Sequence, residues 1–153
     1  MTGDSVVTGD RAPDAPLRHH GVAPLRAAPV SRLFDVIRRD EFSLLLIGVG
    51  SDLPTRYPPI HRVAEDFPMV HEYLVLPDAD AAADEVDAEV AATVLVDVGN
   101  TLRAKYEIDG EAMLLIRPDG YLALRHDVWA PERLSAALRY WLEFAKSTLL
   151  EEK

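Results

Sequence analysis

The sequence predicts one α/β domain in which helices cover both faces of a mixed β-sheet. Its length of 153 residues suits a single domain. Apolar runs of strand length alternate with helical patterns, residues 42–49 are almost continuously apolar, and a hairpin and a helix end the chain. A short, continuous apolar run is typical of a central strand that is buried on both faces. Alternating strands and helices form outer helical layers around a sheet, so we expect three layers.

Residues 1–30 are rich in proline, glycine and aspartate, which predicts an extended arm ahead of the domain proper at residues 31–150. Proline is confined to sheet edges, so the arm should hold at most short edge strands. Ser31 is expected to cap a short helix, since serine favours the N-cap position. The inner face of that helix would carry Leu33, Phe34 and Ile37.

Three inner strands are expected, at residues 42–49, 69–76 and 93–98. Between the first two, Pro58-Pro59 should open a helix, because proline is tolerated in the first helical turn. Residues 78–92 combine alanines with many acids and lack a strong apolar stripe, which predicts a solvated helix or an acidic loop. A short helix around residues 102–106 should follow the third strand.

The segment Arg117-Pro-Asp-Gly120 predicts a type I turn with a bulge, because proline, aspartate and glycine occupy the turn positions that favour them. The flanking strands are expected at residues 112–116 and 121–125. Pro131 should open the last helix. Its predicted buried stripe consists of Leu134, Leu138, Trp141, Leu142, Ala145 and Leu149.

The composition excludes several classes of partner. Sixteen basic and 26 acidic side chains give a net charge of −10, which repels nucleic acids and anionic membranes. No run reaches the ~18 apolar residues of a membrane-spanning helix, and the first residues lack the features of an export signal. The chain has no cysteine, which fits a reducing compartment, so we expect a cytoplasmic protein.

Three stretches carry a family resemblance. They are Thr8-Gly-Asp-Arg-Ala-Pro-Asp-Ala-Pro-Leu17, Arg32-Leu-Phe-Asp-Val-Ile-Arg38 running into Phe42-Ser-Leu-Leu-Leu-Ile-Gly48, and Leu114-Leu-Ile-Arg-Pro-Asp-Gly-Tyr-Leu-Ala-Leu-Arg125. In this order they resemble the C-terminal thioredoxin-like domain of flavin-dependent aromatic-ring hydroxylases, the phenol and polyketide hydroxylase group. The resemblance covers residues 8–126. It implies a thioredoxin-like three-layer α/β/α sandwich with a mixed central sheet.

The chain departs from redox-active thioredoxin-like enzymes at two places. Those enzymes carry reactive cysteines just after the first inner strand, here Gly50-Ser-Asp-Leu-Pro-Thr55, and a cis-proline before the last hairpin, here Asp109-Gly-Glu-Ala112. A hydroxyl does not replace a thiolate. In the resembling hydroxylases, flavin binding and hydroxylation belong to preceding domains that open with a Gly-rich fingerprint, which this chain lacks. The resemblance therefore implies a redox-inactive module without a cofactor.

No catalytic or metal-binding motif stands out. The five histidines lack ligand spacing, and the acidic segment lacks the central glycine of a calcium loop. Ser51 and Asp52 with His61 or His71 lack the strained turn that a hydrolase needs. We therefore expect no catalytic residue and no bound metal. His61 should lie on the polar face of its helix, and His71 should be hydrogen-bonded within a strand.

The leading functional hypothesis is a non-catalytic module for dimerisation or docking, with a second copy or a flavin hydroxylase subunit as the partner. Tyr140 and Phe144 flank the predicted buried stripe and would form the interface, because aromatic residues are enriched there. The alternative is a small-ligand-binding protein or accessory enzyme that uses the cleft near Gly50–Arg56. There Ser51, Thr55 and Arg56 would bind a carboxylate or acidic aromatic ligand through charge-assisted hydrogen bonds. A third hypothesis, a truncated fragment, predicts poor solubility, which the acidic composition argues against.

Overall fold

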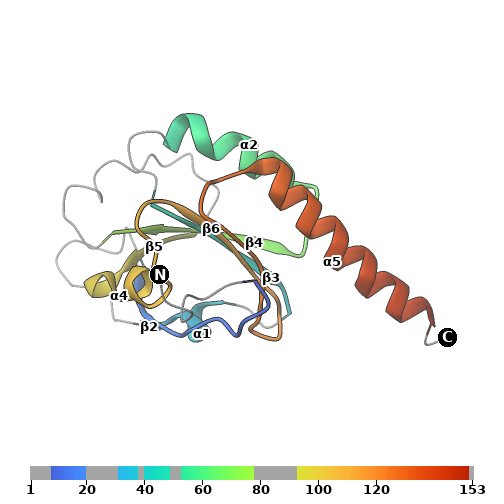
Figure 1. The fold of residues 1–153 in the computed structure, drawn as a ribbon, viewed down its shortest axis with the longest axis horizontal. Helices are drawn as coiled ribbons and strands as arrows, with labels where there is room; N and C mark the ends of the chain where they lie inside the picture. The colour runs from blue at the N-terminus through green and yellow to red at the C-terminus, as the bar shows by residue number, and fades with distance from the viewer. Residues whose placement is uncertain (1–7, 20–30, 38–39, 49–52, 78–92, 152–153) are drawn as a thin grey trace.

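The computed structural model describes residues 8–19, 31–37, 40–48, 53–77 and 93–151, which form one mixed sheet between helices (Figure 1). The strands are β1 (Pro16–His19), β2 (Ser31–Arg32), β3 (Phe42–Ile47), β4 (Val70–Leu76), β5 (Thr93–Asp97), β6 (Ala112–Ile116) and β7 (Leu122–His126). The helices are α1 (Leu33–Val36), α2 (Leu53–Glu65), the 3₁₀ turn η1 (Val98–Asn100), α4 (Thr101–Lys105) and α5 (Pro131–Glu151). The predicted α/β class is confirmed.

The seven strands of the described residues lie in the order β2-β1-β5-β4-β3-β6-β7. The inner strands β3, β4 and β5 are parallel, whereas β6 and β7 continue the sheet antiparallel on one side and β1 and β2 do so on the other. All six residues of β3 are buried, as its continuous apolar pattern predicts. The sheet is therefore mixed, with its most apolar strand shielded on both faces.

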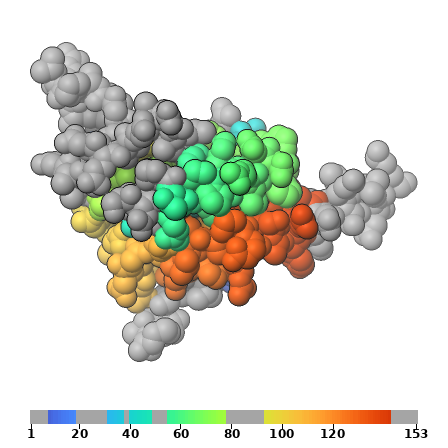
Figure 2. Space-filling view, turned by 90° about the horizontal axis from the view of Figure 1, so that it is seen from above, coloured from blue at the N-terminus to red at the C-terminus, as the bar shows by residue number. Residues whose placement is uncertain are grey.

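Two apolar cores lie on opposite faces of the sheet. Leu44 and Leu46 of β3 point to the core beneath α2 and α5, while Leu45 and Ile47 point to the core lined by α1, α4 and the N-terminal arm. Figure 1 shows α2 and α5 on one side of the sheet and α1 and α4 on the other. In Figure 2, α2 in green and α5 in orange lie side by side over their face. Alternation along β3 thus supplies both cores.

The N-terminal arm is part of the sheet. Residues 8–12 run along the outer edge of β7, where the Leu122 amide donates to the Asp10 carbonyl over 2.8 Å. The arm then crosses to the other side, and β1 pairs with β5. On the way, the buried Tyr106 hydroxyl donates to the Pro13 carbonyl over 2.7 Å. The arm therefore protects an edge strand that would otherwise be open.

The predicted cap of α1 is wrong. Ser31 lies in β2, and α1 begins at Leu33. The arm satisfies the first helical amides instead: Leu33 donates to the Ala15 carbonyl over 2.9 Å, and Phe34 donates to the Asp14 carboxylate over 3.1 Å. The Asp14 carboxylate, 20 residues away in sequence, thus replaces a local N-cap side chain.

The predicted start of α2 is also wrong. The helix begins at Leu53, so Pro58 and Pro59 lie inside it, and the prolines do not open it. Interior prolines remove helical hydrogen bonds. Side-chain hydrogen bonds to other elements stabilise the helical turn before the prolines: Arg56 donates to Glu111, and Tyr57 donates to Glu72 of β4. Tertiary contacts therefore override the local preference.

The hairpin turn and the start of the last helix agree with prediction. Gly120 has φ +89° and donates to the Arg117 carbonyl over 2.9 Å, which closes the turn. Helix α5 opens at Pro131 and buries Leu134 and Leu138 completely. Of the rest of the predicted stripe, Trp141 and Leu142 are half-buried, and the side chains of Ala145 and Leu149 lie outside the described residues. The prediction for 78–92 lies outside the described residues. Among the helices that are described, none has the length and apolarity to cross a membrane.

Candidate functional site

The exit of β3 lies against the loop that precedes β6. Gly48 adopts φ +98°, and a Cβ atom on it would lie 2.3 Å from the Gly110 carbonyl oxygen and 2.8 Å from Glu111 Cα. Glycine suits a left-handed conformation with such a close backbone approach. Gly48 lies just before the segment in which thioredoxin-like enzymes carry their cysteines, and Gly110 and Glu111 lie in the segment that corresponds to their cis-proline.

An ion pair joins the start of α2 to the loop before β6. Arg56 of α2 donates to both carboxylate oxygens of Glu111, over 3.1 and 2.5 Å. The side chains are only 29% and 21% exposed. The Trp129 amide donates to the same carboxylate over 2.6 Å, and the guanidinium carbon lies 5.9 Å from the Trp129 ring centroid. Bidentate, charge-assisted pairs of this kind combine strength with a defined geometry.

The Trp129 indole connects this site to the sheet. Its Nε1–H lies 3.2 Å from the Ile47 carbonyl and 3.0 Å from the Ala112 carbonyl, at the end of β3 and the start of β6. The ring is nearly fully buried. Because a buried indole N–H needs an acceptor, these two carbonyls hold the ring beneath the ion pair.

The carboxylate of Glu111 stays ionised. Burial alone would raise the pKa of Glu111, but hydrogen bonds from Arg56 and from the Trp129 amide, with the charge of Arg56, lower that pKa below its ordinary value. A carboxylate with a lowered pKa is a poor proton carrier near neutral pH. The arrangement is therefore suited to holding two chain segments together.

The predicted ligand cleft remains a prediction. Thr55 is exposed on the first turn of α2, and Ser51 lies outside the described residues. Arg56 already donates to Glu111, so a carboxylate ligand at this guanidinium would have to compete with an internal carboxylate. Glu111 and Trp129 do not stand out as site residues in the sequence. The sequence gives little sign that they share a site, because the two residues are 18 positions apart and meet only in the folded chain.

The histidines bond within the fold. His71 lies 2.8 Å from the Thr93 hydroxyl, as predicted for a strand residue. His61, predicted on the polar face of its helix, has its Nδ1 2.8 Å from the Glu72 carboxylate, which also accepts from the Tyr57 hydroxyl. Within the described ranges, no group of three or more histidine and carboxylate side chains is arranged to bind a metal ion.

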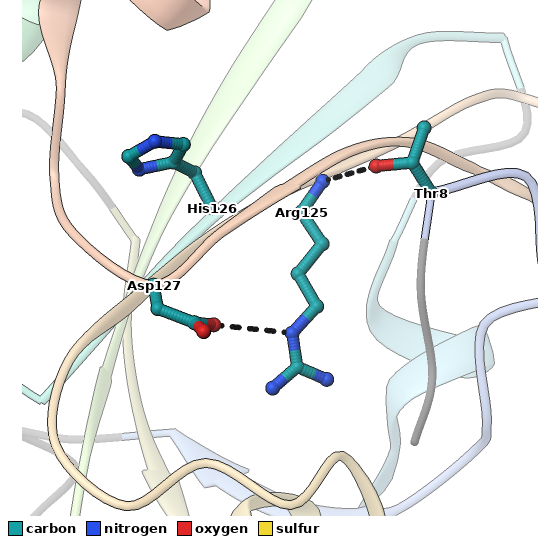
Figure 3. Close-up of a pocket in the computed structure, with 4 residues that line it drawn as sticks. All are labelled: Thr8, Arg125, His126 and Asp127. Atoms are coloured by element: carbon teal, nitrogen blue, oxygen red, sulfur yellow. Dashed lines mark hydrogen bonds and ion pairs between the residues drawn. The ribbon is translucent and has the colours of Figure 1, made fainter. Parts of the chain in front are cut away.

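A depression of about 480 Å³ lies beside β7, lined in the described structure by Thr8, Arg125, His126 and Asp127 (Figure 3). The guanidinium of Arg125 donates to the Tyr106 and Glu107 carbonyls and to Asp127. Its backbone amide donates to the Thr8 hydroxyl over 2.9 Å. With its donors used in this way, Arg125 ties the arm and the α4 turn to β7.

The predicted interface residues lie on α5. The Tyr140 side chain is 62% exposed and packs edge-on against the Trp141 ring, with centroids 5.2 Å apart. The half-buried Trp141 donates its indole N–H to the Ala123 carbonyl over 3.3 Å. The side chain of Phe144 lies outside the described part of the chain. Tyr140 is thus an exposed ring that packs against Trp141, which is itself held by a hydrogen bond to β7.

Solved structures share this fold. The putative thiol:disulfide interchange protein DsbE from Chlorobium tepidum aligns with TM-score 0.68 at 21% identity, over 91% of this chain and 98% of its own. A thiol peroxidase from Chromobacterium violaceum aligns with TM-score 0.70 at 12% identity, over 90% and 89%. At these identities the likeness shows the fold alone. It confirms the thioredoxin-like architecture.

A third structure links the fold to hydroxylases. Aklavinone-11 hydroxylase, solved with FAD and aklavinone, aligns with TM-score 0.52 at 21% identity over 91% of this chain but 25% of its own. No curated protein sequence matches the chain. The sequence profile of the family described as aromatic-ring hydroxylase, C-terminal, matches residues 5–145. The chain therefore belongs to the aromatic-ring hydroxylase C-terminal family and is a cysteine-free, thioredoxin-like domain of it.

Proposed function

We propose that this chain is a redox-inactive assembly module that associates with a second copy of itself. The observation that carries the proposal is Tyr140, an aromatic side chain 62% exposed on a base of packed aromatic and arginine side chains. Tyrosine, tryptophan and arginine are the residues enriched in interface cores and binding hot spots.

The site at the β3 exit supports the redox-inactive part of the proposal. A thioredoxin-like enzyme needs a thiol at this place, whereas this chain has no cysteine and joins the two segments through Arg56 and Glu111. Docking on a flavin hydroxylase is the other form of the same assembly role. It rests on the family of the chain and on the quarter of aklavinone-11 hydroxylase that the chain matches.

Sedimentation of the purified chain tests self-association. The net charge of −10 opposes contact between copies, so the dimer should tighten as salt screens the repulsion. A dissociation constant of ~10 μM, or about 7 kcal/mol, would leave the chain largely dimeric at ~100 μM. A strict monomer at ~100 μM and high salt contradicts the proposal.

A further inference from the structure

A chain of alternating rings and guanidinium groups crosses the surface from α1 to α5. The guanidinium carbon of Arg11 lies 5.9 Å from the Phe34 ring centroid and 5.7 Å from that of Tyr121. The guanidinium carbon of Arg117 lies 5.7 Å from the Tyr121 ring and 4.6 Å from the Trp141 ring. Tyr140 follows, edge-on to Trp141. We call Phe34, Arg11, Tyr121, Arg117, Trp141 and Tyr140 the cation–aromatic stripe.

Arg11 and Tyr140, which lie on either side of the central Arg117 in the stripe, differ in what they lack. Arg11 is exposed, and within the described structure its guanidinium contacts rings and forms no ion pair, although the chain has ten more acids than bases. Tyr140 is an exposed ring over which no described cation lies. Arg11 thus offers a cation to a partner and Tyr140 offers a ring, whereas the charge of Arg117 between them is already neutralised by Asp119.

We infer that the stripe is a two-fold contact between two copies of this chain, in which Arg11 of each copy packs on Tyr140 of the other. The inference rests on the proposed self-association. A two-fold axis between Arg11 and Tyr140 would bring Arg11 of each copy to Tyr140 of the other, so the same contact would form twice. A guanidinium over a tyrosine face is favourable by about 0.5–1 kcal/mol when exposed and about 2 when desolvated.

A partner that is not a second copy would use Arg11 and Tyr140 differently. A protein surface that only supplied carboxylates would be attracted to Arg11 but would gain little from the ring of Tyr140. The second copy uses both the cation of Arg11 and the ring of Tyr140 at once. A double-mutant cycle separates these cases.

The test measures the dimer dissociation constant of the full chain by sedimentation equilibrium in high salt. Arg11→Gln and Tyr140→Ser should each weaken the dimer about tenfold or more, and the double variant should be little weaker than either single variant, because both changes remove one contact. Tyr140→Phe keeps the ring and should stay within about threefold of the parent. Val128→Ser is the matched control, since Val128 is 49% exposed and is not part of the stripe. Unchanged thermal unfolding would show that each variant folds.

Three results would overturn the inference. A dimer that neither change weakens rejects this surface but leaves self-association standing. A dimer that Arg11→Gln weakens and Tyr140→Ser does not rejects the cation–ring contact. A chain that is strictly monomeric refutes the proposed function, and the stripe contact with it.

Discussion

Replacing Glu111 with glutamine removes the charge of the Arg56–Glu111 pair while it keeps the size of the side chain. Three hydrogen bonds meet at this carboxylate, two from Arg56 and one from the Trp129 amide. Glutamine retains one acceptor oxygen, and its amide group would face the guanidinium as a second donor. Arg56 would then stay in place, 29% exposed, without its counter-charge.

The cost follows from the burial of the pair. Removing one partner of a fully buried pair costs about 3–5 kcal/mol, whereas a solvent-exposed pair contributes about 0–1 kcal/mol. The exposures of 29% and 21% place Arg56 and Glu111 between these limits. We therefore expect Glu111→Gln to lower the free energy of unfolding by about 2 kcal/mol at pH 7.

The pH dependence has a defined sign. The pKa of Glu111 in the folded chain lies below its ordinary value of 4.5. A group with a lowered folded pKa stabilises fully above its unfolded pKa, and the contribution is lost as the pH falls through the folded pKa. The stability difference between the parent chain and Glu111→Gln should therefore be largest at neutral pH and smaller at pH ~3.

Urea unfolding of both chains at pH 7 and pH ~3 measures these differences. The matched control is Asp127→Asn, because Asp127 accepts from Arg125 over 3.2 Å but is 77% exposed. That exposed pair should contribute less than about 1 kcal/mol. A Glu111→Gln chain that loses no more stability than this control at pH 7, or that loses as much at pH ~3 as at pH 7, would contradict a stabilising, partly buried ion pair.

Two other changes test the packing around this site and the arm. Tyr106→Phe removes the hydroxyl that donates to the Pro13 carbonyl and should cost about 1–2 kcal/mol in urea unfolding; unchanged stability would show that the arm is held without this bond. Gly48→Ala places a methyl group 2.3 Å from the Gly110 oxygen at φ +98°, whereas Gly120→Ala at φ +89° meets no atom within 4 Å. Gly48→Ala should therefore cost more than the ~1–3 kcal/mol of backbone strain alone, and equal losses at both glycines would contradict the close approach.

Local sequence patterns predicted correctly those elements whose structure depends only on residues close together in the chain. The apolar run of β3, the proline and glycine of the hairpin turn, and Pro131 at the start of α5 act through burial and backbone geometry near each residue. The family motifs in the arm and the hairpin added the thioredoxin-like topology, which alternation of strands and helices alone would leave open.

Contacts between segments far apart in the sequence determined the features that local patterns did not predict, namely the start of α1, the start of α2 and the Arg56–Glu111 pair. Asp14 reaches Phe34 across 20 positions, and Arg56 meets Glu111 across 55, because strand order and register bring these segments together. The Arg56–Glu111 contact, together with the bond from Tyr57 to Glu72, accounts for the early start of α2. The cation–aromatic stripe also joins four separate segments, of which the sequence singled out only Tyr140 as an exposed ring. Periodicity and turn chemistry are properties of neighbouring residues, whereas an ion pair or a shared surface exists only once the sheet has placed its partners side by side.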